Sequence, residues 1–233
     1  MIRALDVATS LGATLARLGS GVAVGRLGPR PALLLELFEF EACPYCRKVR
    51  EALTLLDLEA MILPCPKGGP RFREEVRRRG GKALFPYLVD PNTGKEMYES
   101  AEIVAYLFER YGAGPPPALL TGGLVSSVTL GLASAWRPGL GMRYRRARPA
   151  ELPLELYSFE ASPFCRIVRE ALCVLELPYL LHNVGKGSPR REAFVARSGR
   201  MMVPWLVDPN TGTRLFESAE IVRYLEATYA EGP

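Results

Sequence analysis

Histidine is scarce in this sequence: His182 is the single one among 233 residues. A zinc site built on a cysteine pair normally needs two further cysteine or histidine ligands, so this scarcity argues against a metal site. The regular, even-numbered cysteine framework of small secreted proteins is also missing, because five cysteines occur at irregular spacing. A reducing compartment fits better, and we expect a cytoplasmic protein in which a close cysteine pair is catalytic.

Long apolar runs are absent as well. Asp6 and Arg17 interrupt any apolar run near the N-terminus, which excludes a secretory signal. Residues 1–30 nevertheless hold four arginines and one acidic residue, a composition that resembles an organelle transit peptide. Residues 112–136 carry no charge but lack the dense Leu, Ile and Val content of a spanning helix, so we expect no membrane span. The net charge of +5 is modest, and we expect no nucleic-acid partner.

The chain is an internal duplication. Residues 41–53 (EACPYCRKVREAL) and 160–172 (EASPFCRIVREAL) agree at ten of thirteen positions. Residues 85–110 and 203–228 agree at sixteen of twenty-six, and both contain LVDPNTG followed by ESAEIV. We therefore expect four segments: an N-terminal helical extension (1–33), a first domain (34–112), a helical linker (113–151) and a second domain (152–233).

Each repeat has the same expected order of elements. In the first, we expect strands at 35–40, 60–63, 86–89 and 96–98, and helices at 44–56, 72–79 and 100–110. Residues 90–94 (DPNTG) have the composition of a turn. The order predicts a mixed four-stranded sheet with flanking helices in each α/β domain.

Cys43 is the expected chemical centre. Pro44 suits the first turn of a helix, which places Cys43 at the N-cap beside unpaired N–H groups. The positive end of the helix dipole favours a thiolate there, and the thiolate is the nucleophile. Cys46 lies one turn further on, where a more buried sulfur suits a resolving cysteine. The redox assignment depends on Cys43 being acidified and not buried. Alternatives are two inert structural cysteines or half of a zinc site.

Together these motifs resemble glutaredoxins and the N-terminal domain of glutathione transferases. The tandem arrangement, with CPKGGP after the second strand, is similar to duplicated proteins of this type from cyanobacteria and chloroplasts. The resemblance implies a thioredoxin-like fold for both domains and glutathione as co-substrate. It also makes the chloroplast stroma an alternative location.

The resemblance assigns roles to residues of the first repeat. Cys43 matches the nucleophile, Cys46 the resolving cysteine, Pro86 the cis-proline and Tyr45 a wall of the glutathione groove. The Phe85 backbone would pair with the cysteinyl part of glutathione, while Glu99 and Ser100 would hold the γ-glutamyl end. Glu99-Ser100 could equally be a plain helix cap. The lysine that glutaredoxins often carry before the motif is replaced here by Glu39 and Glu41.

The second repeat has lost the nucleophilic cysteine. Ser162 stands where the first repeat has Cys43, and Cys165 matches Cys46. The groove positions persist, giving a possible second site at Ser162 and Cys165, with glutathione contacts at Val203, Pro204, Glu217 and Ser218. Ser162 resembles the serine of serine-type glutathione transferases; the other interpretation is a degenerate domain that binds or merely supports the first.

Four functions follow. The first is a glutathione-linked thiol–disulfide oxidoreductase that acts through Cys43 on protein disulfides or glutathionylated proteins. The others are glutathione conjugation through Ser162, a non-enzymatic partner-binding scaffold, and an iron–sulfur cluster held by Cys43 with glutathione. Three features stay outside this scheme: Cys65, interpreted as a half-buried thiol; His182, interpreted as structural; and Lys67 with Lys186, each in a surface turn or an anion-binding loop.

Overall fold

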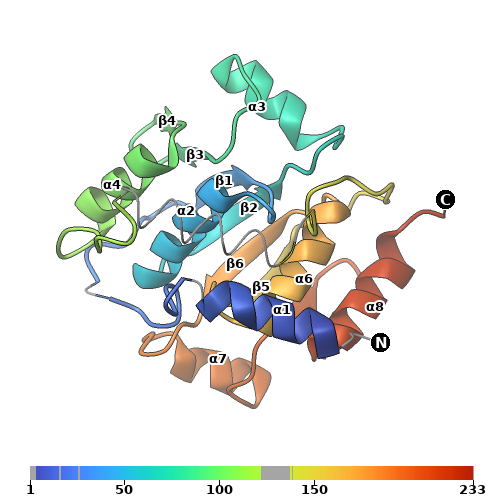
Figure 1. Ribbon diagram of the computed structural model, residues 1–233. Coiled ribbons are helices and arrows are strands. Elements are labelled where there is room, and N and C mark those ends of the chain that lie inside the picture. The colour runs from blue at the N-terminus through green and yellow to red at the C-terminus, as the bar shows by residue number, and fades with distance from the viewer. Residues whose placement is uncertain (1–3, 16, 26, 122–136, 138, 233) are drawn as a thin grey trace.

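A computed structural model of the chain describes residues 4–15, 17–25, 27–121, 137 and 139–232. The first repeat contains β1 (Leu35–Glu39), α2 (Pro44–Leu55), β2 (Ala60–Pro64), α3 (Phe72–Gly80), β3 (Tyr87–Asp90), β4 (Lys95–Met97) and α4 (Ser100–Tyr111). The second contains β5 (Leu154–Ser158), α6 (Pro163–Val174), β6 (Tyr179–Asn183), α7 (Arg191–Ser198), β7 (Trp205–Asp208), β8 (Thr213–Phe216) and α8 (Ser218–Tyr229). An additional helix, α1 (Ala4–Leu15), precedes them (Figure 1). The predicted fold class, two tandem thioredoxin-like α/β domains with a helical extension, is confirmed.

The two repeats share one sheet, which the sequence did not predict. Strands β2 and β6 pair antiparallel, Met61 opposite Leu180, and join the two four-stranded halves. The strand order is therefore β4-β3-β1-β2-β6-β5-β7-β8, with β2 and β6 at the centre. This pairing covers the sheet edge that each repeat would otherwise expose.

Strand alternation divides the core into layers. On one face, Leu35 and Leu37 of β1 and Leu154 and Leu156 of β5 belong to a continuous apolar cluster with α2, α4, α6 and α8. On the other face, two separate clusters form: Phe38 packs with Val76 of α3, and Tyr157 packs with Phe194 of α7. The large shared cluster joins the repeats into one body.

The extensions cross between repeats. In the first, the Val24 N–H donates to the Lys186 carbonyl at 2.9 Å, and the Lys186 N–H donates to Val22 at 2.8 Å. In the second, the Lys67 N–H donates to Met142 at 2.6 Å, and the Tyr144 N–H donates to Lys67 at 3.0 Å. The backbone of Lys67 thus binds the extension that precedes the second repeat, and the backbone of Lys186 binds the extension that precedes the first.

Two glycines let these extensions approach closely. Gly141 has φ of +72°, and a Cβ there would lie 2.8 Å from the Glu41 Cβ. Gly21 is its counterpart, with φ of +81° and a Cβ position 2.9 Å from the Glu160 Cβ. Any side chain would be strained and would collide, so glycine is required at both places. Part of the expected helical linker (122–136 and 138) lies outside the described residues.

None of the described helices is long and apolar enough to span a membrane.

Candidate functional site

The start of α2 positions Cys43. Its backbone is extended (φ −76°, ψ 121°), as an N-cap requires, and Pro44 occupies the first helical position. The Cys46 backbone N–H donates a hydrogen bond to the Cys43 sulfur at 3.3 Å. A hydrogen bond to sulfur, given at the positive end of a helix, stabilises the thiolate more than the thiol.

The two cysteines differ in acidity. Hydrogen bonding from the Cys46 side chain is the main cause that lowers the pKa of Cys43, and backbone bonds from Cys46 and Tyr45 add to it against the effect of burial. Burial, and then the hydrogen bond with Cys43, raises the pKa of Cys46 well above its ordinary value. This order of acidity suits Cys43 as the attacking thiolate and Cys46 as the thiol behind it.

Cys43 is nevertheless buried, with 5% of its surface exposed, while Cys46 has none. The sequence interpretation required a nucleophile that is not buried, and only the acidity half of that requirement is met. Cys43 lines a small pocket between the repeats, together with Arg47, Arg166 and other residues from α2, α6 and the second extension. This pocket is therefore a route toward the sulfur.

The other predicted residues of the first repeat lie around the sheet end. The Phe85–Pro86 peptide is cis, and the Phe85 ring stands edge-on to Phe40, with ring centroids 6.1 Å apart. Tyr45 is 60% exposed on the first turn of α2. Glu99 holds a left-handed backbone (φ 62°) just before α4 and is exposed, whereas Ser100 at the start of α4 is buried.

The second repeat reproduces this geometry with an alcohol in place of the thiol. Ser162 is the N-cap of α6, and its Oγ accepts from the Cys165 backbone N–H at 3.3 Å. Helix α1 packs directly over it: Thr14 Oγ1 donates to the Ala161 carbonyl at 2.8 Å, and Ser10 Oγ donates to the Pro163 carbonyl at 3.0 Å. Ser162 is 5% exposed beneath this cover.

A second pocket lies on the second repeat, at the predicted groove. It is lined by Phe164, Met202, Val203, Pro204, Glu217 and Ser218. Four of these residues are the predicted glutathione contacts, so the structure brings them together, but Ser162 is not among the lining residues. The Val203–Pro204 peptide is cis, and Glu217 has the same left-handed backbone (φ 64°) as Glu99. The pocket is thus a groove separate from the buried hydroxyl.

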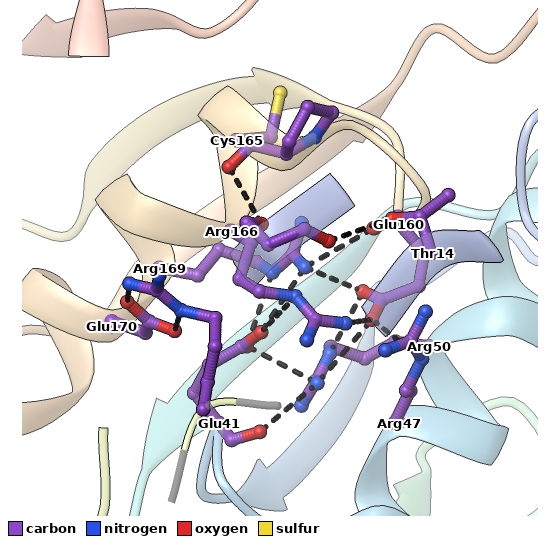
Figure 2. A network of polar contacts seen from close by, with 12 residues as sticks. Thr14, Glu41, Arg47, Arg50, Glu160, Cys165, Arg166, Arg169 and Glu170 are labelled. Atoms are coloured by element: carbon purple, nitrogen blue, oxygen red, sulfur yellow. Dashed lines mark hydrogen bonds and ion pairs between the residues drawn. The ribbon is translucent and has the colours of Figure 1, made fainter. Parts of the chain in front are cut away.

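Between the two N-caps lies a buried network of charges that the sequence analysis missed (Figure 2). Arg169 donates to both carboxylate oxygens of Glu41 at 3.1 Å, across the repeats. Arg50 donates in return to Glu160 at 3.0 Å and also pairs with Glu39. These groups are almost fully buried. The signal was present in the sequence, because the pattern Glu41, Arg47, Arg50, Glu51 recurs as Glu160, Arg166, Arg169, Glu170.

The four remaining residues make structural contacts. His182 Nδ1 lies 2.6 Å from a Glu59 oxygen, and its ring stacks on Tyr157 with centroids 4.3 Å apart. Cys65 is fully buried rather than half-buried, and burial raises its pKa well above the ordinary value. The backbones of Lys67 and Lys186 are used in the crossing strands described above.

Comparison with known proteins identifies the family. The family model described as "Glutathione S-transferase, N-terminal domain" matches residues 37–116 and again 156–233. Among solved structures, a Bombyx mori glutathione transferase, BmGSTD1, is 23% identical over 37% of this chain and 39% of its own length, with a TM-score of 0.33. The trimeric glutathione transferase TDR1 of Leishmania is 15% identical over 87% of this chain and 68% of its own, with a TM-score of 0.29. This chain thus covers about two fifths of the length of the first transferase.

A search of curated proteins finds no match. The two matched segments together cover more than half of the chain, and each coincides with one of the repeats built above. The chain belongs to the glutathione S-transferase N-terminal domain family and carries that domain twice.

Proposed function

We propose that the protein catalyses glutathione-linked thiol–disulfide exchange through Cys43. The observation that carries the proposal is the opposite shift of two neighbouring thiols: the pKa of Cys43 is lowered by hydrogen bonds from Cys46, while burial raises that of Cys46. One sulfur is thereby prepared to attack and the other to remain protonated until it is needed. Membership of the glutathione transferase domain family supports glutathione as the co-substrate.

The proposed reaction has two steps. The Cys43 thiolate attacks the glutathione sulfur of a glutathionylated protein, that S–S bond breaks, and the protein leaves as a thiolate that takes up a proton. A mixed disulfide between Cys43 and glutathione remains. Cys46, after losing its proton, attacks the Cys43 sulfur, which forms a Cys43–Cys46 disulfide and releases glutathione. Alternatively, a second glutathione thiolate attacks the bound glutathione sulfur, which forms oxidised glutathione and frees the Cys43 thiolate.

Groove residues of the first repeat would position the tripeptide. The Phe85 backbone before the cis-proline Pro86 would pair with the cysteinyl unit, as in an added strand. Ser100 begins α4, whose free N–H groups suit a carboxylate, and Glu99 suits the γ-glutamyl amino group. Tyr45 would close the groove. Protein disulfides and glutathionylated proteins are the partners that this chemistry accepts.

Alkylation kinetics test the carrying observation. We expect iodoacetamide to modify Cys43 first, with a pH midpoint below the value near 8.5 of a free thiol. Mass spectrometry after trypsin digestion would assign the modified site. All five cysteines are buried, but burial raises the pKa of the four cysteines other than Cys43, which disfavours their thiolates. Cys46→Ser is the matched variant: it removes the thiol donor and should move the Cys43 midpoint upward.

Access is the condition that can overturn the proposal. If native Cys43 is modified no faster than Cys46, its burial outweighs its acidity and exchange at this sulfur is excluded. A coupled assay with a glutathionylated peptide gives the second criterion. Wild-type activity there must disappear in Cys43→Ser and persist in part in Cys46→Ser.

A second candidate rests on the groove of the second repeat. The pocket formed by Val203, Pro204, Glu217 and Ser218 supports glutathione binding without thiol chemistry. Calorimetric titration with glutathione of the Cys43→Ser/Cys46→Ser/Glu99→Gln protein, in which the groove of the first repeat is weakened, would detect this site, and adding Glu217→Gln should weaken it. Ser162 does not line this pocket, which argues against conjugation through its hydroxyl. Ser162→Ala in an aromatic-electrophile assay tests that exclusion.

A further inference from the structure

Two arginines of the buried network are left over when its carboxylates are assigned. Arg47 and Arg166 occupy equivalent positions in the first turns of α2 and α6, and they are 3% and 6% exposed. The glutamates nearby are already held by other arginines: Glu41 by Arg169 and Arg50, Glu160 by Arg50 and Arg169, Glu51 by Arg17, and Glu170 by Arg137.

Most donors of these two guanidinium groups have no acceptor among the described residues. Arg47 gives its Nε to Glu51 at 3.0 Å, but its Nη1 and Nη2 make no hydrogen bond. Arg166 has neither Nε nor Nη2 bonded. The nearest oxygens of Glu160 and Glu41 lie 3.8–4.0 Å away, too far for a hydrogen bond (Figure 2).

Leaving such buried donors without an acceptor costs free energy. A buried donor without an acceptor loses its hydration and gains nothing, and two buried like charges also repel each other. Burial, and then the Arg47 charge, lowers the pKa of Arg166 to about 10. The buried groups here carry more positive than negative charge. Six arginines (Arg17, Arg47, Arg50, Arg137, Arg166, Arg169) and Lys48 are buried with five glutamates (Glu39, Glu41, Glu51, Glu160, Glu170), and half-exposed Asp6 adds one carboxylate 3.6 Å from Arg137.

A small pocket adjoins the unsatisfied donors. It is lined by Glu41, Ala42, Cys43, Arg47, Arg137, Leu140, Arg166 and Glu170. Its volume is about 20 Å3, slightly more than the roughly 10–15 Å3 that one enclosed water requires. Two of the lining residues are carboxylates, but Arg169 and Arg137 hold them in bidentate pairs. The pocket has room for a single small group, and its free donors are cationic.

We propose that this pocket is a binding site for one chloride-sized monovalent anion, held between the guanidinium groups of Arg47 and Arg166 where the two repeats meet. The anion accepts the hydrogen bonds for which these arginines have no acceptor among the described residues, and it balances the excess positive charge. Its size excludes sulfate and phosphate. The existence of the site does not depend on the redox chemistry proposed above, but Cys43 lines the same pocket, so the anion acts on its thiolate.

Thermal unfolding of the full chain tests the site. Sodium chloride is titrated against sodium methanesulfonate at constant ionic strength, so that screening stays constant while a larger anion replaces the small one. We expect a saturable rise in Tm, about 5–10 °C at a hundredfold excess over Kd. Bromide should act like chloride, whereas sulfate at equal ionic strength should not. A Tm that does not depend on which anion is present would overturn the proposal.

Variants locate the effect. Arg47→Met/Arg166→Met should remove the chloride dependence, and Arg77→Met, on the exposed face of α3, should retain it. An unchanged chloride response in the double variant contradicts the site. If the double variant does not fold, a bromide derivative of wild-type crystals still decides. An anomalous peak between Arg47 and Arg166 supports the proposal, and its absence in crystals grown in bromide rejects it.

A chemical readout comes from Cys43. An anion in the shared pocket repels the thiolate, so chloride should raise the pH midpoint of Cys43 alkylation relative to methanesulfonate. Arg47→Met/Arg166→Met should abolish this difference. This measurement needs only a reactive thiol, and a failure of the exchange assay would leave it intact.

Discussion

The N-caps of α2 and α6 have the same backbone geometry, but their side chains differ: one is a thiol and the other an alcohol. At Cys43 and Ser162 the side chain accepts from the backbone N–H three residues later, at 3.3 Å in both repeats. A thiol in this field can ionise near neutral pH, but an alcohol cannot, because its proton affinity is far higher. Ser162 lies beneath α1, which bonds to the carbonyls of Ala161 and Pro163 on both sides of it. The same backbone geometry is therefore expected to support the proposed exchange at Cys43 and not at Ser162.

The largest expected effect comes from removing that atom. Cys43→Ser makes the first N-cap equal to the second, and exchange should fall by at least about a thousandfold, as when an enzyme loses its nucleophile. Ser162→Ala, the matched change in the second repeat, should leave exchange within the error of the assay. The rate of reduction of a glutathionylated peptide measures both. Equal losses in the two variants would show that the repeats share one reaction.

The reverse substitution sharpens the comparison. In the Cys43→Ser background, Ser162→Cys places a thiol where Cys165 N–H can donate to it. Its alkylation midpoint should lie below that of a free cysteine, since the helix field is the same. A midpoint near 8.5, the value of a free thiol, would mean that α2 lowers the pKa of a thiol at its N-cap and α6 does not.

The charge network gives the next largest effect. Arg50 pairs with Glu39, Glu41 and Glu160. Arg50→Met leaves buried Glu39 without its ion-pair partner and Glu41 and Glu160 with Arg169 as their remaining hydrogen-bonded arginine, and it should cost about 3–5 kcal/mol. Arg166→Met removes a cation that has no hydrogen-bonded carboxylate among the described residues, and its unfolding free energy in chloride-free buffer should be unchanged or higher. Urea denaturation measures both. Similar losses of unfolding free energy in Arg50→Met and Arg166→Met would contradict the distinction drawn between these two arginines.

Much of the fold could be predicted because duplication repeats its evidence. The pairs Pro86 and Pro204, Pro44 and Pro163, and the two DPNTG turns mark equivalent elements twice. The joined sheet could not be predicted, because no pattern in β2 or β6 distinguishes an edge that pairs within the chain from one that does not. The site was half predictable: the N-cap chemistry of Cys43 follows from local sequence. Its burial does not, since Arg166 and Leu140 reach it from more than ninety residues away.

A moderate effect is expected where the extension crosses Glu41. Gly139 and Gly141 both have positive φ, near 76° and 72°. Gly139→Ala meets open space and should cost only the conformational strain, about 1 kcal/mol. Gly141→Ala adds a contact of 2.8 Å with the Glu41 Cβ, and overpacking should raise the cost by about a further 1–3 kcal/mol. Equal unfolding free energies of the two variants would mean that the extension does not press on Glu41.

The smallest effect, and the most specific, lies at Glu39, which the second repeat replaces with Ser158. Burial, reinforced by the charges of Glu41 and Glu160, raises the pKa of Glu39 to about 7, because Arg50 is shared among three carboxylates. The folded protein then holds a proton that the unfolded chain releases near pH 4.5, so this group's contribution is fully present below that pH. It is lost as the pH rises toward 7.

Glu39→Ser copies the second repeat and should remove that part of the pH dependence. The difference in unfolding free energy between wild type and variant should therefore change between pH 4.5 and 7 and stay level above. The same carboxylate raises the pKa of Cys43, so the variant should also shift Cys43 alkylation to lower pH. A parallel pH profile of stability would show that Glu39 ionises at the same pH in the folded and unfolded protein, and an unmoved alkylation midpoint would show that its charge does not act on Cys43. In that case, the charge of Glu39 would not explain any difference in electrostatics between Cys43 and Ser162.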